Sequence, residues 1–172
     1  MDRRRLFQRL SGLFCAAYVA FLAIPGIKFL RAPLRDTRRT SKRRRLAKLS
    51  DLEVGVPRKV VVIDQRTDAW TRYPAGPIGA VWLLRRDDTT VEAFSATCPH
   101  LGCAVQRAAA ADEFFCPCHE AKFSNDGTVI AGPSRRGLDT LDVALESVGD
   151  ETWVAVTFDK FQLGTAEKLS RG

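Results

Sequence analysis

The hydrophobic and polar positions first mark out one long apolar run near the N-terminus. It extends from Leu10 to Ile27 without a charge, and as a helix rising about 1.5 Å per residue it is about 27 Å long. A bilayer hydrocarbon core is about 30 Å thick, so the run nearly spans it. Lys28 can extend toward the headgroups and let Phe29 and Leu30 complete the span. The sequence therefore predicts a transmembrane anchor over 10–30.

The segments on both sides of this run are basic. Within residues 1–9, the stretch Arg4-Arg5-Leu6-Phe7-Gln8-Arg9 resembles a twin-arginine export signal, and we expect this segment to stay in the cytoplasm. No A-x-A cleavage site follows the apolar run, which favours a retained anchor over a cleaved signal peptide. Residues 31–50 are rich in Lys and Arg with little apolar periodicity, which is typical of a solvated linker beside anionic headgroups.

From Leu52 onward the pattern changes to short runs of β-branched and aromatic residues separated by turn residues. These runs cover 59–64, 80–86, 91–95, 113–116, 128–131, 141–148 and 152–158. Asp87-Asp88 and Asn125-Asp126-Gly127 have the composition of turns between neighbouring strands. No helical stripe of 12 or more residues follows position 50. The sequence therefore predicts an antiparallel all-β domain over 51–172.

The formal net charge of +7 is unevenly distributed along the chain. Residues 1–50 hold 14 Lys and Arg against two Asp, whereas residues 51–172 hold 13 against 18 acidic residues. The β domain is therefore mildly acidic, which argues against a nucleic-acid-binding face. The same distribution opposes export of the β domain, because more basic residues follow the apolar run than precede it and the positive-inside rule places them in the cytoplasm.

Both histidines and four of the five cysteines fall between positions 98 and 119, in two short loops. The loops read Cys98-Pro99-His100-Leu101-Gly102-Cys103 and Cys116-Pro117-Cys118-His119. Each offers a thiolate and an imidazole two or three residues apart, which lets one turn of backbone present both to one metal centre. The spacing alone leaves three interpretations open: a tetrahedral zinc site, a set of structural disulfides, or an iron-sulfur cluster in which two histidines replace two cysteines.

The full pattern C-x-H-L-G-C followed by C-P-C-H resembles the Rieske subunit of cytochrome bc-type quinol oxidases. The later Gly132-Pro133 is similar to the third, proline-containing loop of that family. The resemblance implies an all-β antiparallel Rieske domain behind an N-terminal transmembrane helix, with one 2Fe-2S cluster. The implied ligands are Cys98 and Cys116 on the buried iron and His100 and His119 on the exposed iron, with a disulfide between Cys103 and Cys118.

The resemblance also implies a function. The chain would be the electron-transfer subunit of a quinol:cytochrome c oxidoreductase, active only with a membrane cytochrome b-type subunit and a c-type cytochrome acceptor. His100 or His119 would accept a hydrogen bond and a proton from the quinol, and Leu101 would form part of the quinol-docking surface. The alternative is the Rieske subunit of another exported oxidoreductase, such as an arsenite oxidase-like enzyme.

The implied disulfide affects the expected location. Disulfides persist in oxidising compartments, so we expect a single-pass protein of the cell membrane with its β domain on the outer, periplasmic side, despite the flanking charges.

Two positions after the second loop affect the expected redox potential. High-potential members of the family follow the second histidine with Gly-Ser and place a Tyr two residues beyond that Ser, and both hydroxyls donate hydrogen bonds to sulfur. Here Ala121 and Phe123 stand at those places, so both hydroxyls are missing. Because such bonds favour the reduced, more negative cluster, we expect a low potential suited to menaquinol rather than ubiquinol.

Overall fold

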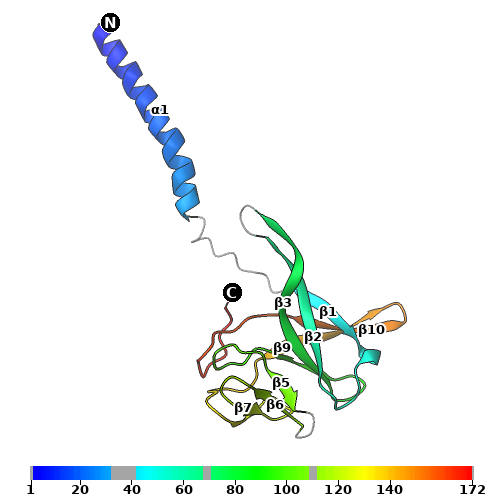
Figure 1. Ribbon diagram of the computed structural model, residues 1–172. Coiled ribbons are helices and arrows are strands. Elements are labelled where there is room, and N and C mark those ends of the chain that lie inside the picture. Colours follow the sequence, from blue (N-terminus) through cyan, green and yellow to red (C-terminus); the bar gives the residue numbers. More distant parts are fainter. Residues whose placement is uncertain (1, 32–41, 68–70, 109–111, 172) are drawn as a thin grey trace. The chain divides into compact units, whose positions relative to one another are not determined.

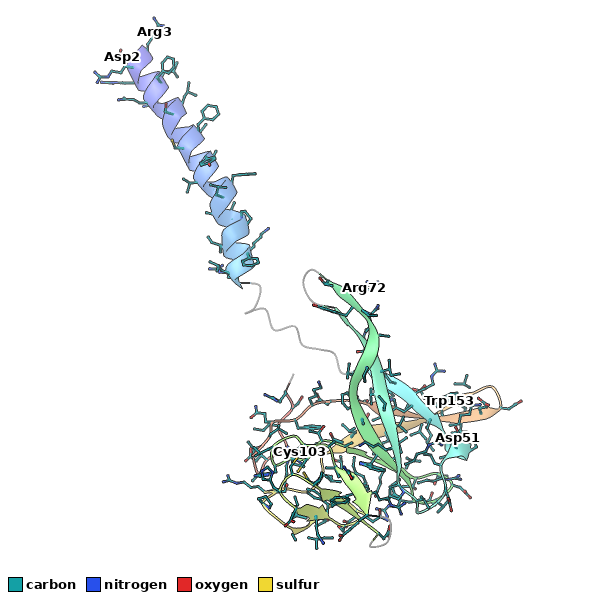
Figure 2. The ribbon with its side chains drawn as sticks, viewed as in Figure 1. Asp2, Arg3, Asp51, Arg72, Cys103 and Trp153 are labelled. Carbon is teal, nitrogen blue, oxygen red and sulfur yellow. A yellow bond between two sulfur atoms is a disulfide. The ribbon has the colours of Figure 1, made fainter. Side chains whose placement is uncertain are left out.

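The computed structural model describes residues 2–31, 42–67, 71–108 and 112–171, and the chain divides into two compact units, Met1–Arg38 and Arg39–Gly172 (Figure 1). The first unit is a single helix, α1 (Arg3–Arg31). None of the α1 side chains is buried, and Figure 2 shows them projecting on all sides of the helix. The helix is long and apolar enough to cross a membrane, and it contains the predicted span 10–30.

The second unit is built on a six-stranded antiparallel sheet with the strand order β1-β10-β9-β4-β3-β2. Its strands are β1 (Arg43–Lys48), β2 (Arg58–Thr67), β3 (Arg72–Arg85), β4 (Val91–Ser95), β9 (Thr140–Val148) and β10 (Glu151–Thr157), and a short 3-10 helix, η2 (Leu49–Asp51), follows β1. Five of the predicted β-type runs lie on these strands. Figure 1 shows β2 and β3 extending beyond the rest of the sheet as a hairpin.

Strand β1 lies in the segment that the sequence analysis assigned to a linker. Of the predicted linker 31–50, residues 32–41 lie outside the described residues, and residues 43–48 pair with β10 instead of being a solvated tether. The strand forms because it buries Ala47 and because its cations meet acidic residues of neighbouring strands. These ion pairs are Arg43 with Asp142 (2.7 Å), Arg45 with Glu146 (3.2 Å), Lys48 with Glu151 and Arg44 with Asp64.

The pair Arg44–Asp64 joins the two edges of the six-stranded sheet. Arg44 belongs to β1 and Asp64 to β2, the first and last strands of the sheet order. The sheet therefore curls until its edge strands contact each other. An exposed edge offers unpaired backbone groups to other chains, and this closure covers part of both edges.

A smaller four-stranded sheet is inserted between β4 and β9, which pair directly with each other at Phe94 and Thr140. Its strands are β5 (Gln106–Ala108), β6 (Glu113–Cys116), β7 (Ala121–Phe123) and β8 (Val129–Ala131), in that order across the sheet. The first Cys-His loop lies between β4 and β5, and the second lies between β6 and β7. Both loops thus belong to the inserted part, residues 96–139.

The inserted sheet rests on a core of its own. Trp82 of β3 and Phe94 of β4 contact the ring of Phe114 on β6, with ring centroids 5.3 and 6.2 Å apart. Cys98 and Cys116 belong to the same buried cluster. The two loops are therefore attached to a packed aromatic base, which restricts how far their first residues can move.

Candidate metal centre

The first loop, residues 98–103, is closed by its own backbone. The N–H of Gly102 donates to the carbonyl of Cys98 (2.9 Å), and the N–H of Cys98 donates to the carbonyl of Cys103 (2.8 Å). Cys98 is 1% exposed, whereas Leu101 at the tip is 60% exposed. The loop therefore directs its first cysteine into the core and leaves its tip at the surface.

The second loop begins at Cys116, the last residue of β6, which is 1% exposed. Pro117, Cys118 and His119 then form an exposed turn. Glu120 completes the reversal with a φ of 55°, a left-handed conformation that costs a non-glycine residue about 1 to 2 kcal/mol. This loop also buries its first cysteine and exposes its histidine.

A disulfide joins Cys103 of the first loop to Cys118 of the second, as the resemblance implied. Its two cysteines are 15 residues apart in the sequence. Closing a loop of this length removes about 3 kcal/mol of conformational freedom from the unfolded chain. Two loops that begin on different strands are thereby held side by side.

The four remaining Cys and His side chains of the loops form two layers. The rings of His100 and His119 lie edge to face, with centroids 4.8 Å apart and an interplanar angle of 87°. His119 is exposed and His100 half-buried, whereas Cys98 and Cys116 are buried and their thiols contact each other. The structure thus places a sulfur pair inside the protein and an imidazole pair at its surface.

Burial raises the pKa of the Cys98 thiol to about 11, although the backbone N–H groups of His100 and Leu101 donate hydrogen bonds to its sulfur and act in the opposite direction. A thiol with this pKa keeps its proton at neutral pH unless a metal displaces it. The preformed backbone donors then stabilise the thiolate. This environment suits a sulfur atom that becomes a metal ligand.

The donor positions discriminate between one zinc ion and a cluster. Tetrahedral zinc requires ligand atoms about 3.3 to 3.8 Å apart. Among the described residues, three ligand-type atoms within 4.8 Å of one another occur at Cys103, Cys116 and Cys118, two of which are bonded to each other. No group that combines Cys98 or Cys116 with both histidines within this distance occurs among the described residues. Two sulfur and two nitrogen donors in separate layers fit a 2Fe-2S cluster, which distributes them over two irons.

The third loop packs closely against Ala121, two residues after His119. Gly132 has a φ of 91°, and a Cβ at this position would lie 2.5 Å from the Cα of Ala121. A side chain is therefore excluded there by both conformation and space. The structure thus places Gly132 of the third loop beside the end of the second loop.

The other residues singled out in the sequence lie close to the two loops. Ala121 pairs with Cys116 across β7 and β6, so its side chain neighbours a buried thiol, and Phe123 is fully buried in the same core. Leu101 is exposed at the tip of the first loop.

Residues near the C-terminus contact the first loop, and the sequence pattern did not predict this contact. The N–H of Gly164 donates to the carbonyl of Pro99 (2.9 Å), and Arg136 holds the segment that contains Gly164. The sequence signal for this is weak: Arg136 and Asp139 stand three residues apart with opposite charges, and they form a buried ion pair.

Comparison with known proteins agrees with this geometry. The model of the Rieske [2Fe-2S] domain family matches residues 43–142, from the start of β1 to beyond the third loop. The cytochrome b6-f complex iron-sulfur subunit of Chlorobaculum tepidum is 46% identical over 57 residues, which are 33% of this chain and 32% of that protein. The cytochrome b6-f complex iron-sulfur subunit 2 of Trichormus variabilis is 27% identical over 158 residues, covering 90% of this chain and 85% of that protein.

Among solved structures, the plasma membrane Rieske protein of Synechocystis PCC 6803 is 26% identical, with a TM-score of 0.42 and coverage of 64% of this chain and 97% of that one. The chain spans about a third of the length of the Chlorobaculum tepidum relative. The family model, by contrast, covers more than half of this chain and includes both Cys-His loops, which identifies the cofactor as one Rieske 2Fe-2S cluster. This chain, an apolar N-terminal helix followed by an antiparallel β domain, therefore belongs to the Rieske [2Fe-2S] domain family.

Proposed function

We propose that the chain is the electron-transfer subunit of a bc-type quinol oxidoreductase, which takes electrons from menaquinol and passes them to a c-type cytochrome. The observation that carries the proposal is the pair of imidazoles at the surface, one exposed and one half-buried, beside a buried thiol pair. The chain also has a helix of membrane-spanning length. The relatives named above as subunits of cytochrome b6-f complexes support it. The cytochrome b-type partner follows from the same likeness.

In this proposal Cys98, His100, Cys116 and His119 hold the cluster. When bound, the cluster accepts and releases one electron. His119 is exposed and His100 half-buried, so the imidazoles are the ligands that a quinol can approach. The ring nitrogen that is not bound to iron accepts the hydrogen bond of the quinol hydroxyl and then its proton, because an imidazole can change protonation state near neutral pH.

Leu101 is proposed to contact the quinol ring. It is 60% exposed and directly follows His100, so an apolar surface lies beside the group that receives the proton. Exposed large apolar side chains often mark such binding surfaces. The disulfide between the loops restricts the movement of Leu101 relative to the two imidazoles.

The substituted positions 121 and 123 support a low-potential centre. Ala121 neighbours the Cys116 thiol, and neither Ala121 nor Phe123 can donate a hydrogen bond to sulfur. The reduced cluster carries one more negative charge, so each missing donor disfavours reduction. A low potential suits a strongly reducing quinol, and this is the basis for naming menaquinol.

We further propose that α1 anchors the protein in the cell membrane, with the β domain on the outer side. The disulfide supports the outer location, because thiols stay reduced in reducing compartments such as the cytoplasm.

The complex itself tests the proposal. Affinity purification of the tagged full chain from detergent-solubilised membranes should recover a haem-containing cytochrome b-type protein and quinol-dependent reduction of a c-type cytochrome. Recovery of a molybdenum enzyme instead would favour the arsenite oxidase-like alternative.

Topology provides a second prediction. The chain should remain in membranes after alkaline carbonate washing, and protease added to intact cells should digest the β domain while a cytoplasmic marker survives. A β domain that is digested only after lysis would contradict the outer location.

The ligand assignment predicts a spectroscopic result. Reduced wild-type protein should show the rhombic electron paramagnetic resonance signal of a two-histidine 2Fe-2S centre, and His119→Ala should abolish it because one iron becomes open to water. Glu120→Gln, at the neighbouring exposed position, should retain the signal. Stoichiometric zinc without the signal in the wild type would refute the assignment.

The potential provides a fourth prediction. Ala121→Ser combined with Phe123→Tyr should raise the midpoint by about 100 mV or more, because a hydrogen bond to a charged group contributes about 1.5 to 3 kcal/mol and 59 mV corresponds to about 1.4 kcal/mol. Redox titration followed by electron paramagnetic resonance measures it. Ala155→Ser, a buried substitution on β10, is the control, and an equal midpoint in all three proteins would contradict the role of positions 121 and 123.

A further inference from the structure

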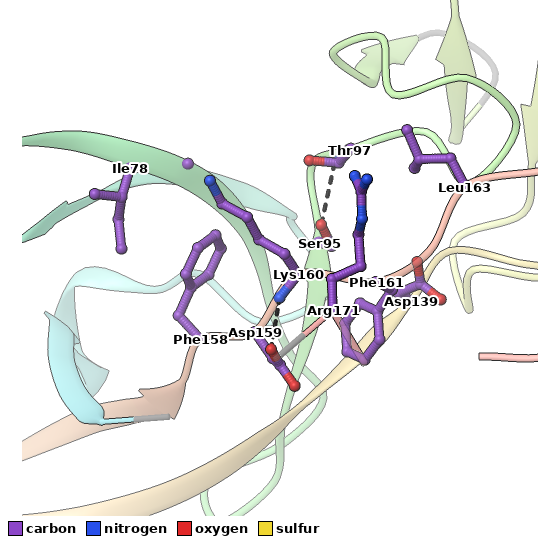
Figure 3. A pocket seen from close by; sticks show the side chains of 11 residues that line it. Ile78, Ser95, Thr97, Asp139, Phe158, Asp159, Lys160, Phe161, Leu163 and Arg171 are labelled. Atoms are coloured by element: carbon purple, nitrogen blue, oxygen red, sulfur yellow. Dashed lines mark hydrogen bonds between the residues drawn. The ribbon is translucent and has the colours of Figure 1, made fainter. Parts of the chain in front are cut away.

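The C-terminal residues 159–171, here called the strap, pack against the first cluster loop. The Gly164 N–H donates to the Pro99 carbonyl (2.9 Å), and a Cβ at Gly102 would lie 2.8 Å from Cδ1 of Leu163. The strap therefore contacts the loop on both sides of its tip. Figure 3 shows strap residues lining one small pocket together with Ser95 and Thr97, which immediately precede the loop.

One residue outside the strap determines where it lies. The side chain of Arg136 is 8% exposed and donates to both carboxylate oxygens of Asp139 (2.8 and 2.9 Å). It also donates to the carbonyl of Thr165 (2.6 Å), to its hydroxyl (3.0 Å) and to the carbonyl of Gln162 (2.7 Å). All five N–H groups of the guanidinium are thus used, in a planar arrangement that a lysine cannot reproduce.

Arg136 follows the third loop and holds the strap. It therefore connects the two segments that pack against the two cluster loops. Gly132, four residues earlier, contacts Ala121 next to the second loop, whereas the strap contacts the first. Lys168 adds a second attachment of the strap, to the carbonyl of Thr140 (2.7 Å), but this point lies farther along the strap from Gly164.

The hydrogen bond from Gly164 is accepted by a peptide group whose N–H donates to the Cys98 sulfur. The Pro99 carbonyl and the His100 N–H belong to one planar peptide unit. The carbonyl accepts the hydrogen bond from Gly164, and the N–H donates to the Cys98 sulfur. A rotation of this unit would disturb both bonds, and a bond accepted at the carbonyl polarises the unit and makes its N–H a stronger donor.

We propose that Arg136 is a positioning residue that, through the strap and the Pro99–His100 peptide, strengthens the hydrogen bond to the Cys98 sulfur and raises the redox potential of the cluster. The inference rests on the proposed function only in that Cys98 is a cluster ligand. Hydrogen bonds to ligand sulfur stabilise the more negative, reduced cluster. Release of the strap therefore lowers the potential without removing any ligand.

Arg136→Lys in the full chain tests the inference, because it keeps the positive charge and removes the planar guanidinium with its five N–H donors. We expect the one-electron reduction equilibrium to shift about three- to tenfold toward the oxidised form, tenfold being about 59 mV, with the rhombic signal retained. Arg135→Lys is the matched control: Arg135 is exposed, and no hydrogen bond from it to the strap occurs in the described part of the chain. Its midpoint should equal that of the wild type.

Leu163→Ala provides a second variant if Arg136→Lys does not fold. It loosens the strap over Gly102 and leaves Arg136 intact, and its midpoint should shift in the same direction. Hydrogen–deuterium exchange of the 98–103 peptide, measured on the chain without its cluster, should be faster in both variants. Faster exchange with an unchanged midpoint would overturn the inference while leaving the proposed function intact. A wild-type protein without the rhombic signal would overturn both.

Discussion

The disulfide between Cys103 and Cys118 is the constraint on which the site depends. The two loops come from different places in the strand order, one after β4 and one between β6 and β7. The first loop is closed by its own backbone hydrogen bonds, and its Pro99 carbonyl also accepts one from Gly164. The covalent bond joins the end of the first loop to the second loop, and the two imidazole rings lie 4.8 Å apart. With the loops joined, the two buried cysteines can act as one set of sulfur donors.

The division of the β domain into two sheets gives these loops their environment. The large sheet contributes Trp82 and Phe94 as a base, and the inserted sheet packs Phe114 onto it. Because a packed interior resists deformation, the thiols are held in an apolar layer while the imidazoles stay at the surface. The same scaffold therefore gives the two thiols low solvent access and leaves His119 exposed and His100 half-buried.

Some of the basic residues that composition assigns to the N-terminal segment form ion pairs within the β domain. The basic segment 31–50 is not uniform, since four basic residues of β1 form ion pairs with acidic residues of β2, β9 and β10. The pair between Arg44 and Asp64 also closes the large sheet. Net charge describes how a segment interacts with its surroundings only after such internal pairs are subtracted.

The sequence by itself determined the elements whose signals are local. The apolar run 10–27 predicts α1, the strand 91–95 and the strand 113–116 were predicted at their observed bounds, and the two Cys-His loops carried the family resemblance that implied the Cys103–Cys118 bond. The helix and the two strands follow from residue patterns within one segment, whereas the disulfide pairing was implied only by the family resemblance. An uncharged stretch, an apolar strand or a Cys-x-His pair does not need a distant partner to be recognised.

The tertiary structure alone decided the elements that depend on distant partners. Strand β1 has the composition of a linker. It becomes a strand because its backbone pairs with β10 and its basic side chains form ion pairs with acidic residues such as Asp142. β5 and β7, of three residues each, form by pairing with other strands: β5 with β6, and β7 with β6 and β8. Arg136 resembles any surface arginine in the sequence, yet it is buried and holds the strap, because its five donors meet acceptors up to 29 residues away. Local periodicity contains no information about such partners, since chain folding brings them together.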